Sequence, residues 1–429
     1  MILLKNVNIK GQGNHDVLIE GQKIKQISDP NTIQIADAEI FDLTGKILLP
    51  GLVDLHTHLR EPGREDSETI ETGSKAAAAG GFTAVHAMAN TLPVADTAGV
   101  VEQVWNLGQR IGLVDVIPIG AVTVGLNGEQ LAELSAMSQS RANVKIFSDD
   151  GKCVHDPVLM RRALEYVKAF DGVIAQHAQE PRLTQNSQMN ESLLSGQLGL
   201  VGWPSVAEES IVARDVLLAE HVDSKLHICH ASTSGTVEIL KWAKQRGIKV
   251  TAEVTPHHLL LTEESCRQYD ARFKVNPPLR SNEDLISLQE ALASGVIDVV
   301  ATDHAPHPAE DKEGEWNQAA FGMTGLETAL AVVATVMLKD KKMSWADIAR
   351  VMSETPAKIA QLSDHGRPIK ENEIANLCVV DPEFEWIVDE NQTYSLSKNN
   401  PYVGLKLKSK VIHTIHKGNF TFKSGEIVL

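Results

Sequence analysis

The middle of the chain alternates between short apolar runs and longer amphipathic stretches. The short runs are rich in β-branched residues and predict strands at residues 52–56, 82–88, 116–122, 144–149, 173–177, 226–230, 249–254 and 298–303. Helical periodicity lies between them, for example at residues 68–79, 157–169, 205–220, 233–246 and 282–294. Eight strand–helix repeats predict an α/β protein with a closed (β/α)8 TIM-like barrel. An open doubly wound sheet is the alternative, but the glycine-rich phosphate loop that normally follows its first strand is missing here.

Both ends of the chain follow a two-residue alternation instead. Short strands are predicted at residues 3–9, 16–20, 23–27, 376–380, 411–417 and 419–422. Neither end holds enough apolar residues for a core of its own, so we expect the two ends to pair into one small β module. The predicted organisation is a barrel domain at residues 51–365 and a β-sandwich module formed by residues 1–50 and 366–429.

Two local features belong to this module and its boundary. The segment Leu49-Pro50-Gly51 is interpreted as a turn that leads into the barrel. Three histidines, His15, His413 and His416, fall in the module and are expected at its surface.

Composition narrows the class of protein. A chain of 429 residues fits a barrel of about 250 residues with a smaller module. Its net charge of −16 argues against nucleic acid and anionic membranes as partners, although a small anionic substrate remains possible. No apolar run reaches the roughly 18 residues of a membrane span. The four cysteines lack CxxC spacing, which favours reduced thiols in a cytoplasmic protein.

The strongest chemical signal is the sequence Asp54-Leu55-His56-Thr57-His58. Residues two apart in a strand point to the same side, so His56 and His58 project together into the barrel mouth. Two imidazoles at this spacing can hold one divalent ion. A chance pair of histidines is the alternative, and the spacing alone does not decide between them.

Four further polar residues favour the metal site. His177, His230, Asp150 and Asp303 each end a predicted strand, and barrel active sites are assembled at that face. Unpaired polar groups are costly there, so independent residues would not collect at so many strand ends. The set is sufficient for two ions: one held by His56, His58 and Asp303, the other by His177 and His230, with Asp150 bridging. The run Asp149-Asp150-Gly151 is also typical of a turn that leads to the next helix, and for one of its two aspartates this structural role stays the alternative.

Other residues near these strand ends could act on a substrate. Asp303 could take a proton from water and return it to a leaving nitrogen. Arg60 lies two residues beyond His58 and could bind a carboxylate bidentately, or it could form a surface salt bridge with Glu61. Asn90 and Asn276 could bind substrate or cap turns, and His307 could face the substrate or solvent.

A series of motifs carries a family resemblance. In chain order they are PGLVDLHTHLREPG (50–63), MANT (88–91), FSDDG (147–151), EVTPHHLLLT (253–262), KVNPPLR (274–280), ATDHAPH (301–307) and FGMTGLET (321–328). Together they resemble the dihydroorotases of the amidohydrolase superfamily, in particular the longer class I type. The resemblance implies reversible interconversion of N-carbamoyl-L-aspartate and L-dihydroorotate in pyrimidine synthesis, with one or two Zn²⁺ ions per subunit.

The resemblance also implies a role for each site residue. The implied metal ligands are His56, His58, Asp150, His177, His230 and Asp303, and Asp303 is also the implied general acid/base. Arg60, Asn90, Asn276 and His307 match residues that hold the substrate's carboxylate and ring, and Phe321 and Gly322 match a loop whose backbone contacts the ring. Many family members bridge their metals with a carboxylated lysine, whereas the DDG motif here favours Asp150.

Alternatives remain open at this stage. The chain could be an allantoinase or a dihydropyrimidinase, for which Arg60 is the discriminating residue. It could also be an inactive scaffold for aspartate transcarbamoylase, but such chains are expected to lack metal ligands and all six are present here. A homo-oligomer is expected, and a complex of the active enzyme with that transcarbamoylase is not excluded. Residues 308–320 are a candidate lid.

Overall fold

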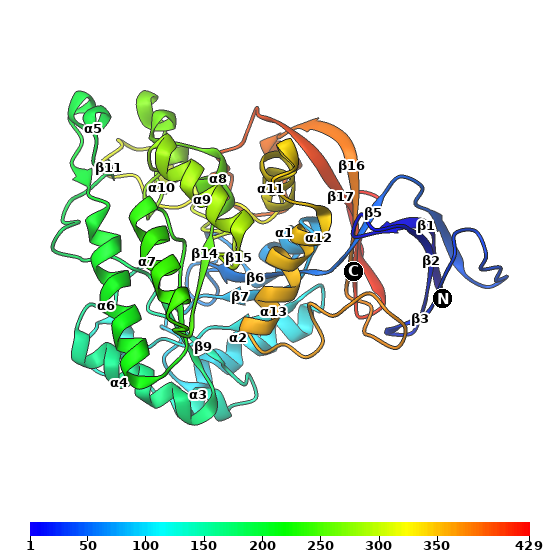
Figure 1. The fold of residues 1–429 in the computed structure, drawn as a ribbon, viewed down its shortest axis with the longest axis horizontal. Coiled ribbons are helices and arrows are strands. Elements are labelled where there is room, and N and C mark those ends of the chain that lie inside the picture. Colours follow the sequence, from blue (N-terminus) through cyan, green and yellow to red (C-terminus); the bar gives the residue numbers. More distant parts are fainter.

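The computed structural model describes residues 1–429 and shows a closed barrel flanked by a β-sheet module (Figure 1). The eight barrel strands are β6 (Leu52–Thr57), β7 (Phe82–Ala87), β8 (Asp115–Pro118), β9 (Ile146–Phe147), β10 (Val173–Gln176), β13 (Leu226–Ile228), β14 (Val250–Val254) and β15 (Val299–Val300). All of their pairings are parallel. A bridge from Gly120 to Phe147 joins β8 to β9, and one from Thr57 to His304 closes the ring. The predicted barrel is confirmed, and the open sheet is excluded.

Helices cover the outside of the barrel. The longer ones are α1 (Ile70–Ala79), α2 (Ala98–Ile111), α4 (Pro157–Val167), α6 (Val206–Val222), α7 (Ser234–Gln245), α9 (Asn282–Ser294) and α11 (Ala329–Met337). The short ones are α3 (Leu134–Gln139), α5 (Leu193–Leu198), α8 (Pro256–Leu260), α10 (Ala309–Lys312), α12 (Trp345–Ala349) and α13 (Thr355–Ile359). Their starts follow the sequence: Ser281, for example, caps α9 in a capping box with Asp284. A core of 68 buried residues packs the helices onto the strands.

The two chain ends form one nine-stranded sheet. Its strands are β1 (Ile2–Ile9), β2 (Asn14–Glu20), β3 (Lys23–Ser28), β4 (Glu39–Asp42), β5 (Ile47–Pro50), β16 (Leu377–Ile387), β17 (Lys406–His416), β18 (Asn419–Lys423) and β19 (Glu426–Ile427). The predicted turn at Leu49 and Pro50 is wrong, because both residues lie in β5. This strand runs parallel to β1 and antiparallel to β16. Local turn signals could not predict this strand, because its partner β16 comes from the other end of the chain.

The strands β16 and β17 are longer than predicted, and the loop between them, residues 388–405, reaches back to the barrel. Its Ser397 hydroxyl donates to the carbonyl of Ser67, 2.6 Å away. The predicted surface position of His413 and His416 is wrong, since they are only 4% and 6% exposed. Both lie on β17, which packs against α1 and α11, and Thr414 of this strand donates to the carbonyl of Ala78.

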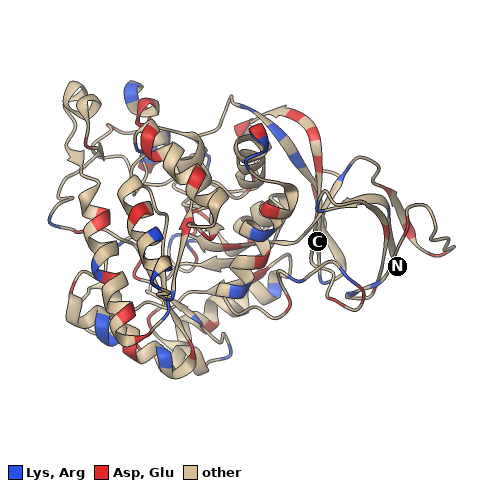
Figure 2. Ribbon diagram, viewed as in Figure 1, with Lys and Arg blue, Asp and Glu red and all other residues tan.

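The remaining surface features are ordinary for a globular chain. Acidic and basic residues are interspersed along the outer helices rather than separated into one basic face (Figure 2). No helix is long and apolar enough to cross a membrane. All four cysteines are free thiols.

Candidate metal centre

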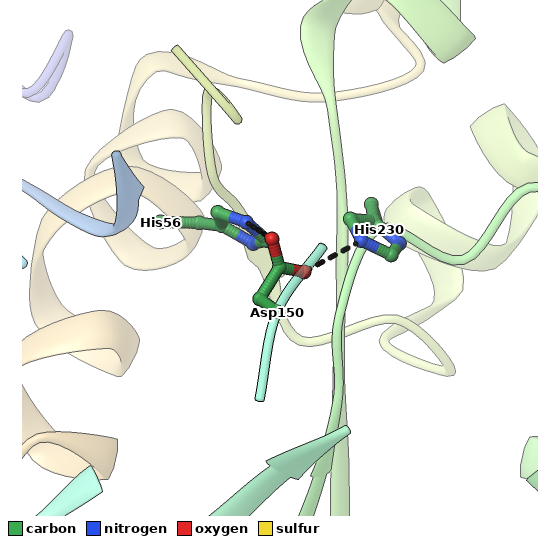
Figure 3. A group of neighbouring side chains, drawn as sticks. All are labelled: His56, Asp150 and His230. Atoms are coloured by element: carbon green, nitrogen blue, oxygen red, sulfur yellow. Dashed lines mark hydrogen bonds and ion pairs between the residues drawn. The ribbon is translucent and has the colours of Figure 1, made fainter. Parts of the chain in front are cut away.

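Asp150 lies between two pairs of imidazoles at the carboxyl ends of the barrel strands. Its Oδ2 is 3.3 Å from His56 Nε2 and 3.4 Å from His58 Nε2. Its Oδ1 is 3.1 Å from both His177 Nδ1 and His230 Nε2. Figure 3 shows the carboxylate placed between His56 and His230, with one oxygen directed to each side. The structure therefore brings together all of the residues that the sequence suggests as ligands around this carboxylate.

Asp303 joins the cluster from the end of β15. Its Oδ1 is 3.1 Å from His58 Nε2 and 3.4 Å from His56 Nε2. Burial alone would raise the pKa of Asp303, but the facing imidazoles outweigh burial and lower it to about 2. The backbone of Asp303 has φ of 48°, a left-handed conformation that is uncommon for a residue other than glycine. The fold holds this carboxylate ionised and turned into the mouth.

The donor set fits a divalent cation. His56 Nε2 is completely buried and has no hydrogen-bond partner, although two carboxylates face it. The mutual spacing of the facing nitrogen and oxygen atoms, 2.8–3.4 Å, is close to the roughly 3.3 Å expected for ligands about 2 Å from one tetrahedral ion. Four imidazoles with two carboxylates are a mixture that borderline cations such as Zn²⁺ accept.

The two adjacent aspartates of the FSDDG motif have different surroundings. Asp149 turns away from the imidazoles, and its Oδ1 accepts hydrogen bonds from the backbone amides of Val122 (2.8 Å) and Thr123 (2.9 Å). These contacts tie the end of β9 to the segment after β8. Asp149 is therefore the aspartate with the structural role, and Asp150 is the one that faces the cluster.

Glu253 on β14 contacts His56 on the side away from the cluster. The sequence analysis did not single out this residue. Its carboxylate lies 2.6 Å from His56 Nδ1 and 3.0 Å from His227 Nε2, and it accepts from the backbone amide of His230 at 3.1 Å. Burial would raise the pKa of Glu253, but His56 and His227 hold it well below its usual range. A carboxylate behind a histidine orients the ring and directs its other nitrogen forward. The motif EVTPHHLLLT contains this residue, but motif matching does not reveal its contact with His56.

Arg60 and His307 meet beside the cluster. The Arg60 Nε donates to the carbonyl of Pro306 at 3.1 Å, and its Nη2 lies 3.2 Å from His307 Nε2. The same His307 nitrogen is 2.9 Å from the carbonyl of Phe321. Burial lowers the pKa of Arg60 to about 10, which leaves the guanidinium charged at neutral pH. No salt bridge to Glu61 forms, so this alternative from the sequence is not seen.

The loop at Phe321 and Gly322 is held close to His307. A Cβ added at Gly322 would lie 2.8 Å from Ala305 Cβ and 2.9 Å from His307 Nε2, and φ there is 140°, so only glycine fits. The Lys274 ammonium lies 4.5 Å from the centre of the Phe321 ring. Lys312 of α10 donates to the Gly322 carbonyl at 2.9 Å, which connects the candidate lid to this loop.

The side chains of the two candidate asparagines, Asn90 and Asn276, each already make one contact within the protein. Asn90 Oδ1 lies 3.0 Å from His58 Nδ1, so this side chain orients a candidate ligand. Asn276 Nδ2 donates to Gln179 Oε1 at 3.1 Å, and Gln179 in turn contacts His177 Nε2 at 2.8 Å. The Asn276 Oδ1 is buried without a partner. An unsatisfied acceptor beside the cluster is suited to a substrate N–H.

Asn399, in the loop that returns from the β module, is a further residue that sequence reasoning missed. Its Nδ2 donates to the carbonyls of Ala305 (3.0 Å) and Gly322 (3.1 Å), and its Oδ1 accepts from the His307 amide (3.2 Å). It is 4% exposed. One side chain thus joins the two loops that border Arg60, and no sequence signal near residue 399 indicates this contact.

Known proteins of similar sequence give a consistent result. A family model described as dihydro-orotase-like matches residues 45–236. The chain is 60% identical over 425 residues to a dihydroorotase of Streptomyces coelicolor, with 99% of each chain covered. It is 54% identical over 427 residues to a dihydroorotase of Mycobacterium tuberculosis, again with 99% of each covered.

Solved structures of similar fold include an L-hydantoinase from Arthrobacter aurescens. It has a TM-score of 0.89 and 26% identity, and the match covers 100% of this chain and 97% of the other. A dihydropyrimidinase from Brevibacillus agri NCHU1002 has a TM-score of 0.85 and 21% identity, with 100% and 96% covered, which bears on the fold alone. The barrel with its terminal sheet is thus an amidohydrolase architecture.

Proposed function

This chain belongs to the dihydroorotase family, whose hydrolases act on a cyclic amide in pyrimidine biosynthesis. We propose that the site at its barrel mouth catalyses the opening and closure of the L-dihydroorotate ring, with Asp303 as general acid/base. The product of ring opening is N-carbamoyl-L-aspartate. The observation that carries the proposal is the position of Asp150, with one oxygen toward each imidazole pair and Asp303 beside it.

The cluster would hold one or two Zn²⁺ ions. His56, His58 and Asp303 surround one position, His177 and His230 surround the other, and Asp150 would bridge them. When bound, such an ion supplies Lewis acidity toward the ring carbonyl and lowers the pKa of water. The outer contacts from Glu253 to His56 and from Asn90 to His58 keep the ligand nitrogens directed at these positions.

Asp303 moves the proton in this reaction. Its facing imidazoles keep it ionised, so a carboxylate oxygen is available to accept a proton from the attacking water. After the ring amide bond breaks, the same oxygen returns the proton to the leaving nitrogen. In the direction of ring closure the carboxylate takes the proton from the carbamoyl nitrogen as that nitrogen attacks the carboxyl carbon of the substrate, and gives it to the departing hydroxide, which leaves as water.

The carboxylate of the substrate would bind at Arg60. This guanidinium is charged and stands beside His307, and its bidentate geometry matches a carboxylate. The free Oδ1 of Asn276 offers a hydrogen-bond acceptor that the N–H of a ring amide can use. Arg60 therefore makes the site selective for a ring that bears a carboxylate.

A hydantoinase or dihydropyrimidinase activity is the second candidate, favoured by the similarity to the L-hydantoinase structure. The experiment compares hydrolysis of L-dihydroorotate, allantoin and dihydrouracil by the purified protein, before and after chelation and zinc addition. We expect zinc-restored turnover of L-dihydroorotate alone. Turnover of another ring in its place would assign the sister activity. If no ring is hydrolysed with zinc bound, even with aspartate transcarbamoylase added, the chain is not an active hydrolase.

A further inference from the structure

A second group, of two buried imidazoles and one half-buried carboxylate, lies away from the barrel mouth. Asp115 is the first residue of β8, His365 follows α13, and His416 ends β17. One ligand atom from each lies within 4.8 Å of the others. Because Asp115 begins its strand, this cluster is at the end of the barrel opposite to the candidate metal centre, where the β module joins the barrel.

In the neutral ring of His416, the hydrogen-bond partner of Nδ1 leaves Nε2 without a hydrogen. Its Nδ1 faces the carbonyl of Gly112 at 3.4 Å, so this nitrogen carries the hydrogen in the neutral ring. The Nε2 is then a bare lone pair. It is completely buried, makes no hydrogen bond and lies 3.4 Å from Asp115 Oδ2. Two lone pairs that face each other in a buried space repel unless a proton or a cation lies between them.

His365 can offer the same kind of lone pair. Its Nε2 is 2.8 Å from Asp115 Oδ2, and its Nδ1 is 3.0 Å from the Thr83 hydroxyl. That hydroxyl can accept from Nδ1–H while its own hydrogen points to the carbonyl of Leu52 at 3.5 Å. A ligand histidine typically donates its other ring hydrogen to an outer oxygen in this way. The Asn376 Nδ2, 3.4 Å from the same ring nitrogen, favours the other tautomer, so metal binding requires this weaker contact to give way.

The charges around Asp115 leave one oxygen for a cation. Lys417 pairs with Oδ1 at 2.7 Å, whereas both imidazoles face Oδ2. Lys417 opposes a cation at this distance, and the exposed residue Asp364, which lines the same cavity, adds one negative charge to its wall. This cavity is lined by Asp115 and His365 but not by His416, and its volume of about 230 Å³ leaves room for water molecules on the side of Asp115 and His365.

We propose that Asp115, His365 and His416 form a second divalent-metal site of the zinc class, separate from the catalytic centre. Two imidazoles with one carboxylate are typical zinc ligands, and the cavity provides the remaining position for water. The bound ion links β17 of the β module, through His416, to the barrel, through Asp115 and His365. Its role is structural, because the cluster and Asp303 lie at opposite ends of the barrel strands. In the alternative arrangement His416 is protonated and forms an ion pair with Asp115.

Metal content distinguishes these two arrangements. The wild type, His416→Gln and His365→Gln are dialysed against buffered zinc, and zinc per chain is measured by mass spectrometry. His221→Gln, which removes an exposed imidazole at the end of α6, is the matched control. We expect each cluster variant to hold one zinc ion fewer than the wild type and the control, with hydrolysis of L-dihydroorotate unchanged. Equal zinc content in all four proteins, each still active, would overturn the proposal.

Anomalous diffraction at the zinc edge tests the wild type without any substitution. Crystals grown with zinc should show one peak among Asp115, His365 and His416 in addition to those at the barrel mouth. Peaks at the barrel mouth with none at this cluster refute the site, even if the substituted proteins fail to fold.

Discussion

Asn399 lies in the β-module loop, yet its substitution should impair substrate binding at the barrel mouth. Its side chain makes three hydrogen bonds, buried ones to Ala305 and Gly322 and a partly buried one to His307. At about 1 kcal/mol each, Asn399→Ala removes about 3 kcal/mol that holds the two loops together. If about half of this must be restored when the ring binds, about 1.4 kcal/mol, KM for L-dihydroorotate rises roughly tenfold.

Steady-state kinetics measure this effect, and a neighbouring residue provides the control. Asn400 is equally buried, but its side chain accepts only from the amide of Tyr402, at 2.8 Å. Asn400→Ala should therefore cost some stability, visible as a lower urea midpoint, and leave KM near the wild-type value. Asn399→Asp keeps the acceptor for His307 but places a carboxylate against two carbonyls, so it should not restore KM.

A clear result would refute this reasoning. If Asn399→Ala is folded, binds zinc like the wild type and keeps a KM within about twofold of it, the loops do not depend on this side chain. If Asn400→Ala raises KM as much as Asn399→Ala, the effect comes from general loosening of the β-module loop rather than from the three hydrogen bonds.

Three further predictions follow from the same structure. Asp303→Asn should lower kcat by about 10²–10⁴-fold, because the general acid/base is lost, and near-normal turnover with zinc bound would show that another group moves the proton. Arg60→Lys should raise KM for L-dihydroorotate by about 10- to 100-fold through loss of a bidentate charged contact worth about 1.5–3 kcal/mol, while an equal effect on any dihydrouracil hydrolysis would contradict carboxylate recognition. Burial raises the pKa of Glu327 from 4.5 to about 7, so the folded protein binds this proton more tightly than the unfolded chain and loses stability as pH rises between those values. Glu327→Gln keeps the Oε1 acceptor for the amides of Tyr394 and Ser395. This variant should be more stable than the wild type by up to about 3 kcal/mol at pH 8 and should show no such gain at pH 4. Urea unfolding at both pH values measures the difference, and an equal difference at the two values would refute the prediction.

Much of the fold could be predicted because barrel strands and helices have local periods. The helix at Asn282–Ser294 has the predicted bounds, since Ser281 and Gly295 mark its ends in the sequence itself. Strand ends were less accurate: the predicted strand 298–303 is observed only at Val299–Val300. Beyond these residues the chain turns to place Asp303 in the mouth, and its hydrogen bonds are set by β6 and not by its own pattern.

The candidate ligands could be found because a barrel directs the ends of all its strands to one face. The sequence by itself determined that His56, His58, His177, His230 and Asp303 would meet there, since this requires only strand direction and the two-residue alternation. The sequence favoured Asp150 as the bridging carboxylate, and the tertiary structure shows that its side chain, and not that of Asp149, faces the imidazoles. Only the tertiary structure decided that Glu253 stands behind His56 and that Asn399, from the β module, joins the loops beside Arg60. These contacts join residues that are distant along the chain or that differ only in which way a turn directs them. Local periodicity carries no information about either, because packing between elements fixes both.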